Sequence, residues 1–415
     1  MSFRERIEEI LQAMQRNKLR TLLTAFGVFW GIWMLIILLG AGQGLQNGVQ
    51  KSTLLDATNS IWFFTQRTSL PYKGLPSGRE LEFKEEDLQA IEDNVEGVDV
   101  ISPENFLWGN YVVKHEDKSG PFIVYGAEHD YFDIKVTQKY TSGRKLNPSD
   151  DIQSRKVCTI GDAAVEKLFA PDEDPIGKYV SVKGVMFRIV GVYHFEGYGR
   201  WQSQRLYIPF STFQRVFNPG RSVNLFAVTT EAGFSGKELE QDILRILKQR
   251  QIVHPDDNQA YWTHNQEEQH KSIMGLFLGI KSFIWLVGLG TLFSGIVGVS
   301  NIMIVLVKER TREIGIRKAV GAKPASIITM IVTESIIVTS IAGYVGLVLG
   351  MAMIEGIGFV LEQSGEEIEY FNNPEINLTT AIAAVLILIV AGTLAGFFPA
   401  LKAARIKPVQ ALKND

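Results

Sequence analysis

The sequence has few of the residues that enzymatic and metal-binding sites most often use. It contains one cysteine, Cys158, so no disulfide can form within the chain. None of its six histidines are spaced at i, i+4, the arrangement that places two metal ligands on one helix face. His264 and His270 flank Glu267 and Glu268, but a solvated loop is the simpler interpretation. We therefore predict no catalytic residue and no metal site.

Two further absences narrow the class of protein. The formal net charge is −3, from 42 Lys+Arg and 45 Asp+Glu, so the chain lacks the basic field that nucleic-acid-binding proteins use. No G-x-x-x-x-G-K-[ST] motif occurs, and Gly177-Lys178 and Gly236-Lys237 lack the rest of that pattern. We expect no nucleic-acid partner, no ATPase activity in this chain and no cofactor bound to it.

Charge is nearly missing from four long stretches, which are the strongest signal in the sequence. A helix needs about 20 apolar residues to cross roughly 30 Å of hydrocarbon. Thr21–Leu39 and Asn377–Leu401 carry no charge, Ser326–Ile354 carries only Glu334, and the residues between Lys271 and Lys308 carry only Lys281. We predict transmembrane helices at 19–44, 273–307, 325–355 and 377–401. The second is longer than a bilayer requires, so part of it is expected to form a stalk.

The distribution of Lys and Arg sets the predicted orientation. Basic residues gather before the first span, between the second and third spans, and after the fourth. The short loop 356–376 carries five glutamates and neither Lys nor Arg: Glu362, Glu366, Glu367, Glu369 and Glu375. By the positive-inside rule both termini are cytoplasmic. We predict a multi-pass protein of the inner (plasma) membrane.

The remaining segments follow from this topology. Residues 1–18 have apolar and charged faces, which predicts an amphipathic helix on the cytoplasmic membrane surface rather than a cleaved signal peptide. Residues 45–272 are predicted to lie outside the cytoplasm. Short β-rich runs alternate with helical patterns in this segment, which predicts a large α+β domain with two lobes. Lys183-Gly184 separates two alternating stretches and predicts a hairpin. Residues 402–415 form a cytoplasmic tail.

The connector between the second and third spans carries the most specific pattern. Gly321 suits the position after a helix end, and Pro324 suits the first turn of the next helix. Residues 308–324 are therefore predicted to form a short cytoplasmic helix, in which charges surround the apolar set Ile314, Ile316, Ala319 and Val320. Two interpretations are open: a basic loop resting on lipid headgroups, or a coupling helix that docks a cytoplasmic motor.

Several motifs resemble the MacB/FtsX family of ABC transporter permease subunits. They are VLVKERTREIGIRKAVGAK at 305–323, AGTLAGFFPALKAARIKPVQAL at 391–412 and RNKLRTLLTAFG at 16–27. In the outer domain GDAAVEKLF at 161–169, DPIGK at 174–178 and FRIVGVY at 187–193 resemble a MacB-like periplasmic core domain. The resemblance covers nearly the whole chain and favours the coupling helix over the headgroup interpretation.

This resemblance implies partners and a mechanism. We expect a second permease copy, identical or homologous. We also expect a cytoplasmic ATPase that binds ATP and Mg²⁺, and we expect it to be a separate polypeptide because the chain starts directly with the membrane elbow. ATP hydrolysis would move the outer domain through the stalk, a mechanotransmission that serves export or efflux. A periplasmic adaptor and an outer-membrane channel are further expected partners. Lipoprotein release, FtsX-like signalling to a cell-wall hydrolase, and a membrane-anchored binding domain without a motor are the alternatives.

The candidate site residues fall into three groups. The ATPase-coupling group consists of Glu309, Arg310, Arg312, Glu313, Gly315, Arg317, Lys318 and Gly321. Glu334 is a polar residue within the membrane, either hydrogen-bonded to a neighbouring helix or acting as a hinge or relay. Gly27, Gly31, Gly40, Gly44 and Gly48 recur at the spacing of close helix packing, the last three against the second span or a second copy.

Overall fold

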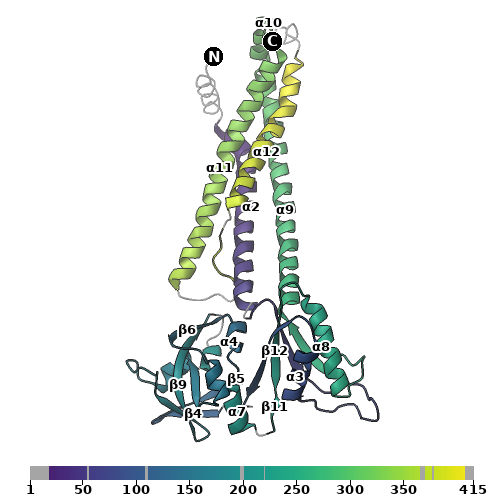
Figure 1. The fold of residues 1–415 in the computed structure, drawn as a ribbon. Helices are drawn as coiled ribbons and strands as arrows, with labels where there is room; N and C mark the ends of the chain where they lie inside the picture. Colours follow the sequence, from purple (N-terminus) through teal and green to yellow (C-terminus); the bar gives the residue numbers. More distant parts are fainter. Residues whose placement is uncertain are drawn as a thin grey trace. The chain divides into compact units, whose positions relative to one another are not determined.

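The structure, a computed structural model, describes residues 18–53, 56–107, 111–196, 201–218, 220–364, 370–375 and 378–406. Residues 1–17 of the predicted amphipathic helix and residues 407–415 of the predicted tail lie outside this part. The chain divides into two compact units: a helical unit, Met1–Gln50 with Gly275–Asp415, and a sheet unit, Lys51–Met274 (Figure 1).

Four helices of the described chain are long and apolar enough to cross a membrane. They are α2 (Lys18–Thr53), α9 (Gln266–Glu309), α11 (Pro324–Ser364) and α12 (Leu378–Ala404). Their lengths of 36 and 44 residues make α2 and α9 about 54 and 66 Å long, more than a bilayer requires. The predicted fold class, four transmembrane helices with a large α+β domain between the first two, is confirmed.

The helices extend beyond the apolar runs that predicted them. We expected a loop from residue 356, yet α11 continues to Ser364. Glu355 ends the apolar run, but no proline follows Pro324 until Pro374. A charge closes a bilayer-compatible stretch without breaking helical hydrogen bonds, whereas proline removes a backbone donor. For the same reason α2 and α9 include polar residues beyond the predicted spans.

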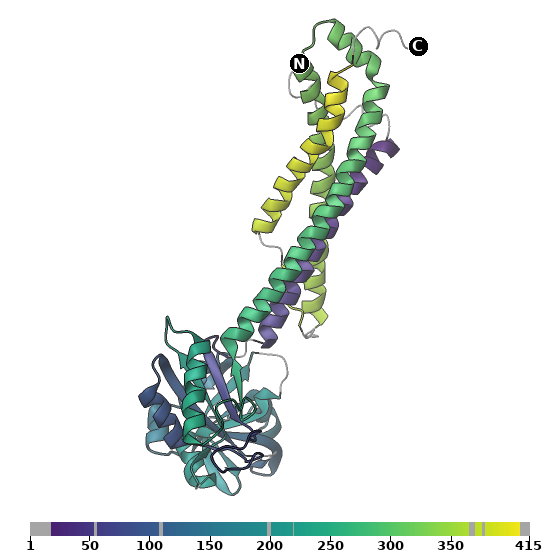
Figure 2. The same cartoon turned by 90° about the vertical axis from the view of Figure 1, so that its right-hand side faces the viewer.

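Buried apolar side chains from all four long helices form the core of the helical unit. Val28 and Ile32 of α2 are buried together with Val299 of α9, Ile331 of α11 and Ala395 of α12. Figure 2 shows α2 and α9 side by side, in agreement with the close approach of their glycines described below.

The sheet unit contains a closed ring of six strands. Strand β10 (Arg205–Pro209) pairs with β7 (Val157–Gly161), and the ring continues through β9 (Val185–Phe195), β8 (Tyr179–Val182), β4 (Tyr111–His115) and β5 (Lys118–Ala127). Parallel pairing of β5 with β10 closes it. Each strand contributes to one buried cluster: Val113, Phe122, Val124, Cys158, Ile160, Val180, Val182, Phe187, Ile189, Leu206 and Ile208.

The same sheet extends beyond the ring as an antiparallel lobe. From β5 it runs through β3 (Val98–Phe106), β12 (Leu225–Thr230), β1 (Ser60–Thr65) and β13 (Tyr261–Asn265). Helices α3 (Glu85–Asn94) and α8 (Gly236–Arg250) share a buried cluster with this lobe, which includes Phe63, Phe226, Ile91 and Ile243. Strand β6 (Gln138–Gly143) pairs with β9, and β2 (Phe83–Lys84) pairs with β11 (Ser222–Val223).

Short helices connect the strands of both lobes. They are α4 (Tyr131–Ile134), α5 (Pro148–Ile152), α6 (Asp162–Leu168), α7 (Phe210–Phe217) and a 3-10 turn at Gln202–Gln204. The predicted hairpin is confirmed: Val182 pairs with Val185, and Lys183 and Gly184 have φ of 48° and 82°. Positive φ at both central residues is the backbone that a two-residue hairpin turn requires.

Candidate functional site

A short helix, α10 (Thr311–Ala319), forms the elbow between α9 and α11. It is shorter than the predicted 308–324, because Glu309 still belongs to α9 and Pro324 begins α11. Gly321 has φ of 99°, the left-handed conformation that ends helices. Its N–H donates to the Lys318 carbonyl at 3.1 Å, and the Ala322 N–H donates to Arg317 at 2.9 Å. These bonds satisfy carbonyls at the helix end and turn the chain towards α11.

The two sides of α10 differ in burial. Ile314 is 2% exposed and Gly315 is buried, so both lie on the packed side. Ile316 is 47% exposed and Val320 is 85% exposed. Arg312 and Glu313 are also exposed. Because Arg312, Ile316 and Val320 follow at intervals of four residues, they share one side of the helical turn.

Arg310 and Glu334 form an ion pair that joins the elbow to α11. The Arg310 Nη1 lies 3.3 Å from the Glu334 Oε2, and Glu334 is 5% exposed. Arg310 was predicted to belong to the ATPase-coupling group, and Glu334 to lie alone within a span. This pairing is the contact that the structural interpretation of Glu334 requires. The hinge or relay interpretation stays a prediction.

Lys318 joins α10 to the end of α12. Its Nζ donates to the carbonyls of Ala404 and Ile406 at 2.8 and 2.7 Å. Carbonyls at a helix end lack intrahelical donors and carry partial negative charge, so a lysine there is stabilising. Arg317 donates to Glu313 at 2.7 Å on the same helix and contacts the Met330 sulfur of α11 at 3.1 Å.

The eight predicted coupling residues therefore separate into two sets. Those that lie against the helical unit are Arg310, Gly315, Arg317 and Lys318, whereas those on the exposed side are Glu309, Arg312, Glu313 and Gly321. Ile316 and Val320 were not among the predicted site residues, although both belong to the predicted apolar set of this helix. Their i, i+4 spacing indicates that they share one side of the helix, but it does not indicate which side packs against the neighbouring helices.

Three of the five predicted packing glycines lie at close contacts between helices. A Cβ at Gly27 would lie 3.2 Å from the Cα of Gly295, and one at Gly31 would lie 3.4 Å from the Cα of Leu292, both on α9. A Cβ at Gly40 would lie 2.8 Å from the side chain of Ile354 on α11. The backbones of α2 and α9 can approach this closely only where side chains are missing.

Gly44 and Gly48 face the segment 370–375 that precedes α12. A Cβ at Gly44 would lie 2.9 Å from the Phe371 ring, and one at Gly48 would lie 2.2 Å from the Tyr370 carbonyl carbon. The Asn372 N–H donates to the Gly44 carbonyl at 3.0 Å. Within the described chain, Gly40, Gly44 and Gly48 thus lie nearest to α11 and this segment, and not to the second span. Their packing against a second copy, the other predicted alternative, stays a prediction.

Comparisons with known proteins cover both units. Residues 21–246 match the family model of the MacB-like periplasmic core domain, and residues 274–408 match that of the FtsX-like permease C-terminal region. The chain is 28% identical over 419 residues to the pyoverdine export ATP-binding/permease protein PvdT of Pseudomonas putida. It is 27% identical over 416 residues to the macrolide export ATP-binding/permease protein MacB of Vibrio parahaemolyticus.

These alignments cover 99% and 100% of this chain but 60% of each relative. Among solved structures, the periplasmic region of MacB from Actinobacillus actinomycetemcomitans aligns with 55% of this chain and 95% of its own, at 21% identity and a TM-score of 0.43. Four apolar helices and both family matches identify a multi-pass inner-membrane protein. The chain belongs to the MacB/FtsX family of ABC transporter permeases, in which a MacB-like periplasmic core domain is combined with an FtsX-like permease region.

Proposed function

We propose that this chain is the permease of an ABC exporter, and that α10 receives motion from an ATPase outside these 415 residues. The family implies an ATPase partner. The observation that carries the proposal is the division of α10 into a side bonded to α11 and α12 and an exposed side with two large apolar residues.

The exposed side of α10 has the composition of a docking surface. Val320, at 85% exposed, and Ile316 are flanked by Arg312 and Glu313. Protein interfaces commonly combine an apolar anchor with a polar rim. The six basic residues of the connector favour the cytoplasmic side for this surface under the positive-inside rule, and ATP is available on that side.

The packed side of α10 supplies the route by which motion would spread. Arg310 follows the last residue of α9 and pairs with Glu334 of α11, while Lys318 is bonded to the end of α12. A displacement of α10 would therefore act on three helices together. Packing of Gly27 and Gly31 on α9 would add α2. The length of α2 and α9 beyond a bilayer span would carry the motion to the periplasmic domain.

Export is the favoured outcome of this motion. PvdT and MacB are named for the export of pyoverdine and of macrolides. We propose that the periplasmic domain drives export from the outer side of the membrane, as part of an assembly with a second permease copy. An adaptor and an outer-membrane channel would then complete the path. ATP and Mg²⁺ would bind the ATPase.

Photo-crosslinking from α10 tests the proposal. A benzophenone amino acid at Val320 should crosslink to a polypeptide that carries an ABC ATPase domain, in native membranes. Crosslinks to phospholipid alone would contradict the proposal and support the headgroup interpretation. The mass of the product also distinguishes a separate ATPase subunit from an ATPase domain on the same chain.

Charge substitution on the same surface provides the functional test. Ile316→Asp with Val320→Asp should abolish ATPase stimulation by the permease in nanodiscs, because a carboxylate cannot be buried at an apolar contact without a partner. Met186→Asp is the matched control, since Met186 is 49% exposed on the periplasmic domain. Unchanged stimulation in the doubly substituted protein would refute the docking surface.

A further inference from the structure

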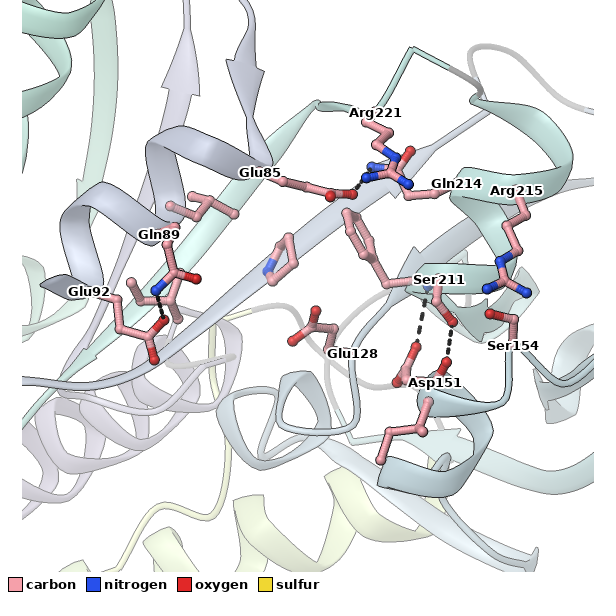
Figure 3. A pocket seen from close by; sticks show the side chains of 15 residues that line it. Glu85, Gln89, Glu92, Glu128, Asp151, Ser154, Ser211, Gln214, Arg215 and Arg221 are labelled. Carbon is pink, nitrogen blue, oxygen red and sulfur yellow. Dashed lines mark hydrogen bonds between the residues drawn. The ribbon is translucent and has the colours of Figure 1, made fainter.

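The sheet unit contains a cleft with a volume of about 710 Å³, shown in Figure 3. Its walls come from α3, α5 and α7, together with β3 and the residue that follows β5. This volume lies within the range of roughly 300–1,000 Å³ that is typical of sites for small organic ligands. Apolar side chains line part of it: Leu88, Ile101, Pro103, Ile152 and Phe210.

Negative charge predominates in the cleft. The charged residues that line it are four acids, Glu85, Glu92, Glu128 and Asp151, and two arginines, Arg215 and Arg221. Three of the acids accept hydrogen bonds from neighbours in the cleft wall. Glu85 accepts from Gln214 at 3.2 Å, Glu92 from Gln89 at 3.3 Å and Asp151 from the Ser211 N–H at 3.4 Å.

Glu128 differs from the other three acids because its carboxylate has no partner in the part of the chain that the structure describes. Burial, together with the negative charges of Asp151, Asp130, Glu85 and Glu92, raises its pKa to about 7. Figure 3 shows the side chain between α3 and α5, in the middle of the cleft wall. A partly buried carboxylate surrounded by like charges is unfavourable unless a positive group compensates it.

Two other polar atoms in the lining are also unsatisfied. Gln214 is 6% exposed, and its Oε1 accepts no hydrogen bond within the described chain. The Asp151 Oδ2 is likewise buried without a donor there. Buried acceptors are normally hydrogen-bonded, and each unsatisfied one calls for an explanation. Both of these atoms are buried beneath the cleft surface, whereas Glu128 is only partly buried. Glu128 is therefore the unpaired acceptor that a positively charged N–H group in the cleft can reach.

The arrangement favours an organic cation over a metal ion. Among the described residues, no three histidine, cysteine or acidic side chains are close enough together to hold a metal ion. The carboxylates are instead distributed around a space that apolar side chains share. An ammonium or guanidinium group can bond to one carboxylate while its apolar substituent occupies the rest of the cleft.

We propose that this cleft binds an organic cation, with its ammonium or guanidinium group at Glu128 and its apolar body against Leu88, Ile152 and Phe210. The site is separate from the coupling surface on α10 and does not rest on the proposed export function. A cleft of this size accommodates a drug-sized molecule, so the ligand is a small amphiphile and not a protein segment.

Calorimetry on the full chain in nanodiscs tests the proposal, with empty nanodiscs as the blank. The probes are 4-phenylbutylamine and 4-phenylbutan-1-ol, which have similar size but differ in charge. At pH 8, above the pKa of Glu128, the amine should bind and the alcohol should bind at least about tenfold more weakly, because it cannot form the charged hydrogen bond. Equal binding of the two probes, or binding of neither, overturns the proposal without any substitution.

Two variants then locate the charge. Glu128→Gln should weaken amine binding about tenfold or more and leave the alcohol unchanged. Glu238→Gln, on the exposed side of α8, removes the same charge elsewhere and should change neither. Because the negative charge of Glu128 has no positive partner, the Glu128→Gln variant should unfold at the same temperature as the wild type or at a higher one. A loss of amine binding in this variant would then not be caused by unfolding. Wild-type affinity in Glu128→Gln would refute the assignment.

Discussion

The Arg310–Glu334 ion pair offers a sharp test of how α10 is attached to the membrane helices. At 3.3 Å, two unit charges attract by about 5 kcal/mol at an effective dielectric constant of about 20. Desolvation of Glu334, which is 5% exposed, offsets much of this gain. We therefore expect a net coupling energy of about 1–3 kcal/mol between the two side chains.

A double-mutant cycle measures this coupling directly. Arg310→Gln and Glu334→Gln should each destabilise the helical unit, because each leaves one charge without this partner. The double variant, with two neutral amides, should recover about 1–3 kcal/mol relative to the sum of the single effects. The assay is equilibrium unfolding in mixed SDS and dodecylmaltoside micelles, followed by circular dichroism.

A second cycle supplies the matched control. Arg312 lies two residues from Arg310 but is exposed, so Arg312→Gln and Glu334→Gln should have additive effects. If the Arg310–Glu334 cycle were additive within about 0.5 kcal/mol, the ion pair would not hold α10 to α11. The link to α11 in the route proposed for motion would then rest on the Arg317–Met330 contact.

Three further predictions address other parts of the chain. Gly48→Ala should release the segment 370–375 and speed its amide hydrogen exchange, since a Cβ there meets backbone at 2.2 Å, whereas Gly279→Ala, with no atom within 4 Å, should have little effect. Burial raises the pKa of Glu104 from 4.5 to about 7, so the folded state holds this proton more tightly and the periplasmic domain should lose stability as pH rises between these values. Glu104→Gln should raise the free energy of unfolding at pH 8 by up to about 3 kcal/mol. If the wild-type protein unfolded at the same temperature at pH 5 and at pH 8, that result would contradict this reasoning. A cysteine at Arg312 should react with a membrane-impermeant maleimide only from the cytoplasmic side, while buried Cys158 stays unlabelled; labelling from outside would reverse the predicted topology.

Features that depend on composition and on the local order of residues could be predicted from the sequence. The four spans follow because the bilayer demands about 20 apolar residues in a row, whatever they contact. The Lys183-Gly184 turn and the helix end at Gly321 follow from backbone preferences of single residues. The predicted helix ends were less accurate, as α11 shows. Hydropathy indicates which residues suit the membrane, but it does not indicate where the backbone hydrogen bonding of a helix stops.

Features that depend on which surface is covered were decided by the tertiary structure alone. Arg310, Arg312, Arg317 and Lys318 look alike as basic residues of one connector, yet Arg310 pairs with a residue 24 positions away and Lys318 with carbonyls 86 and 88 positions away. Likewise, no local pattern brings Glu128 together with α3 and α7. Periodicity determines which side chains share a face, but only packing between distant segments determines which face is buried and which charge is left without a partner.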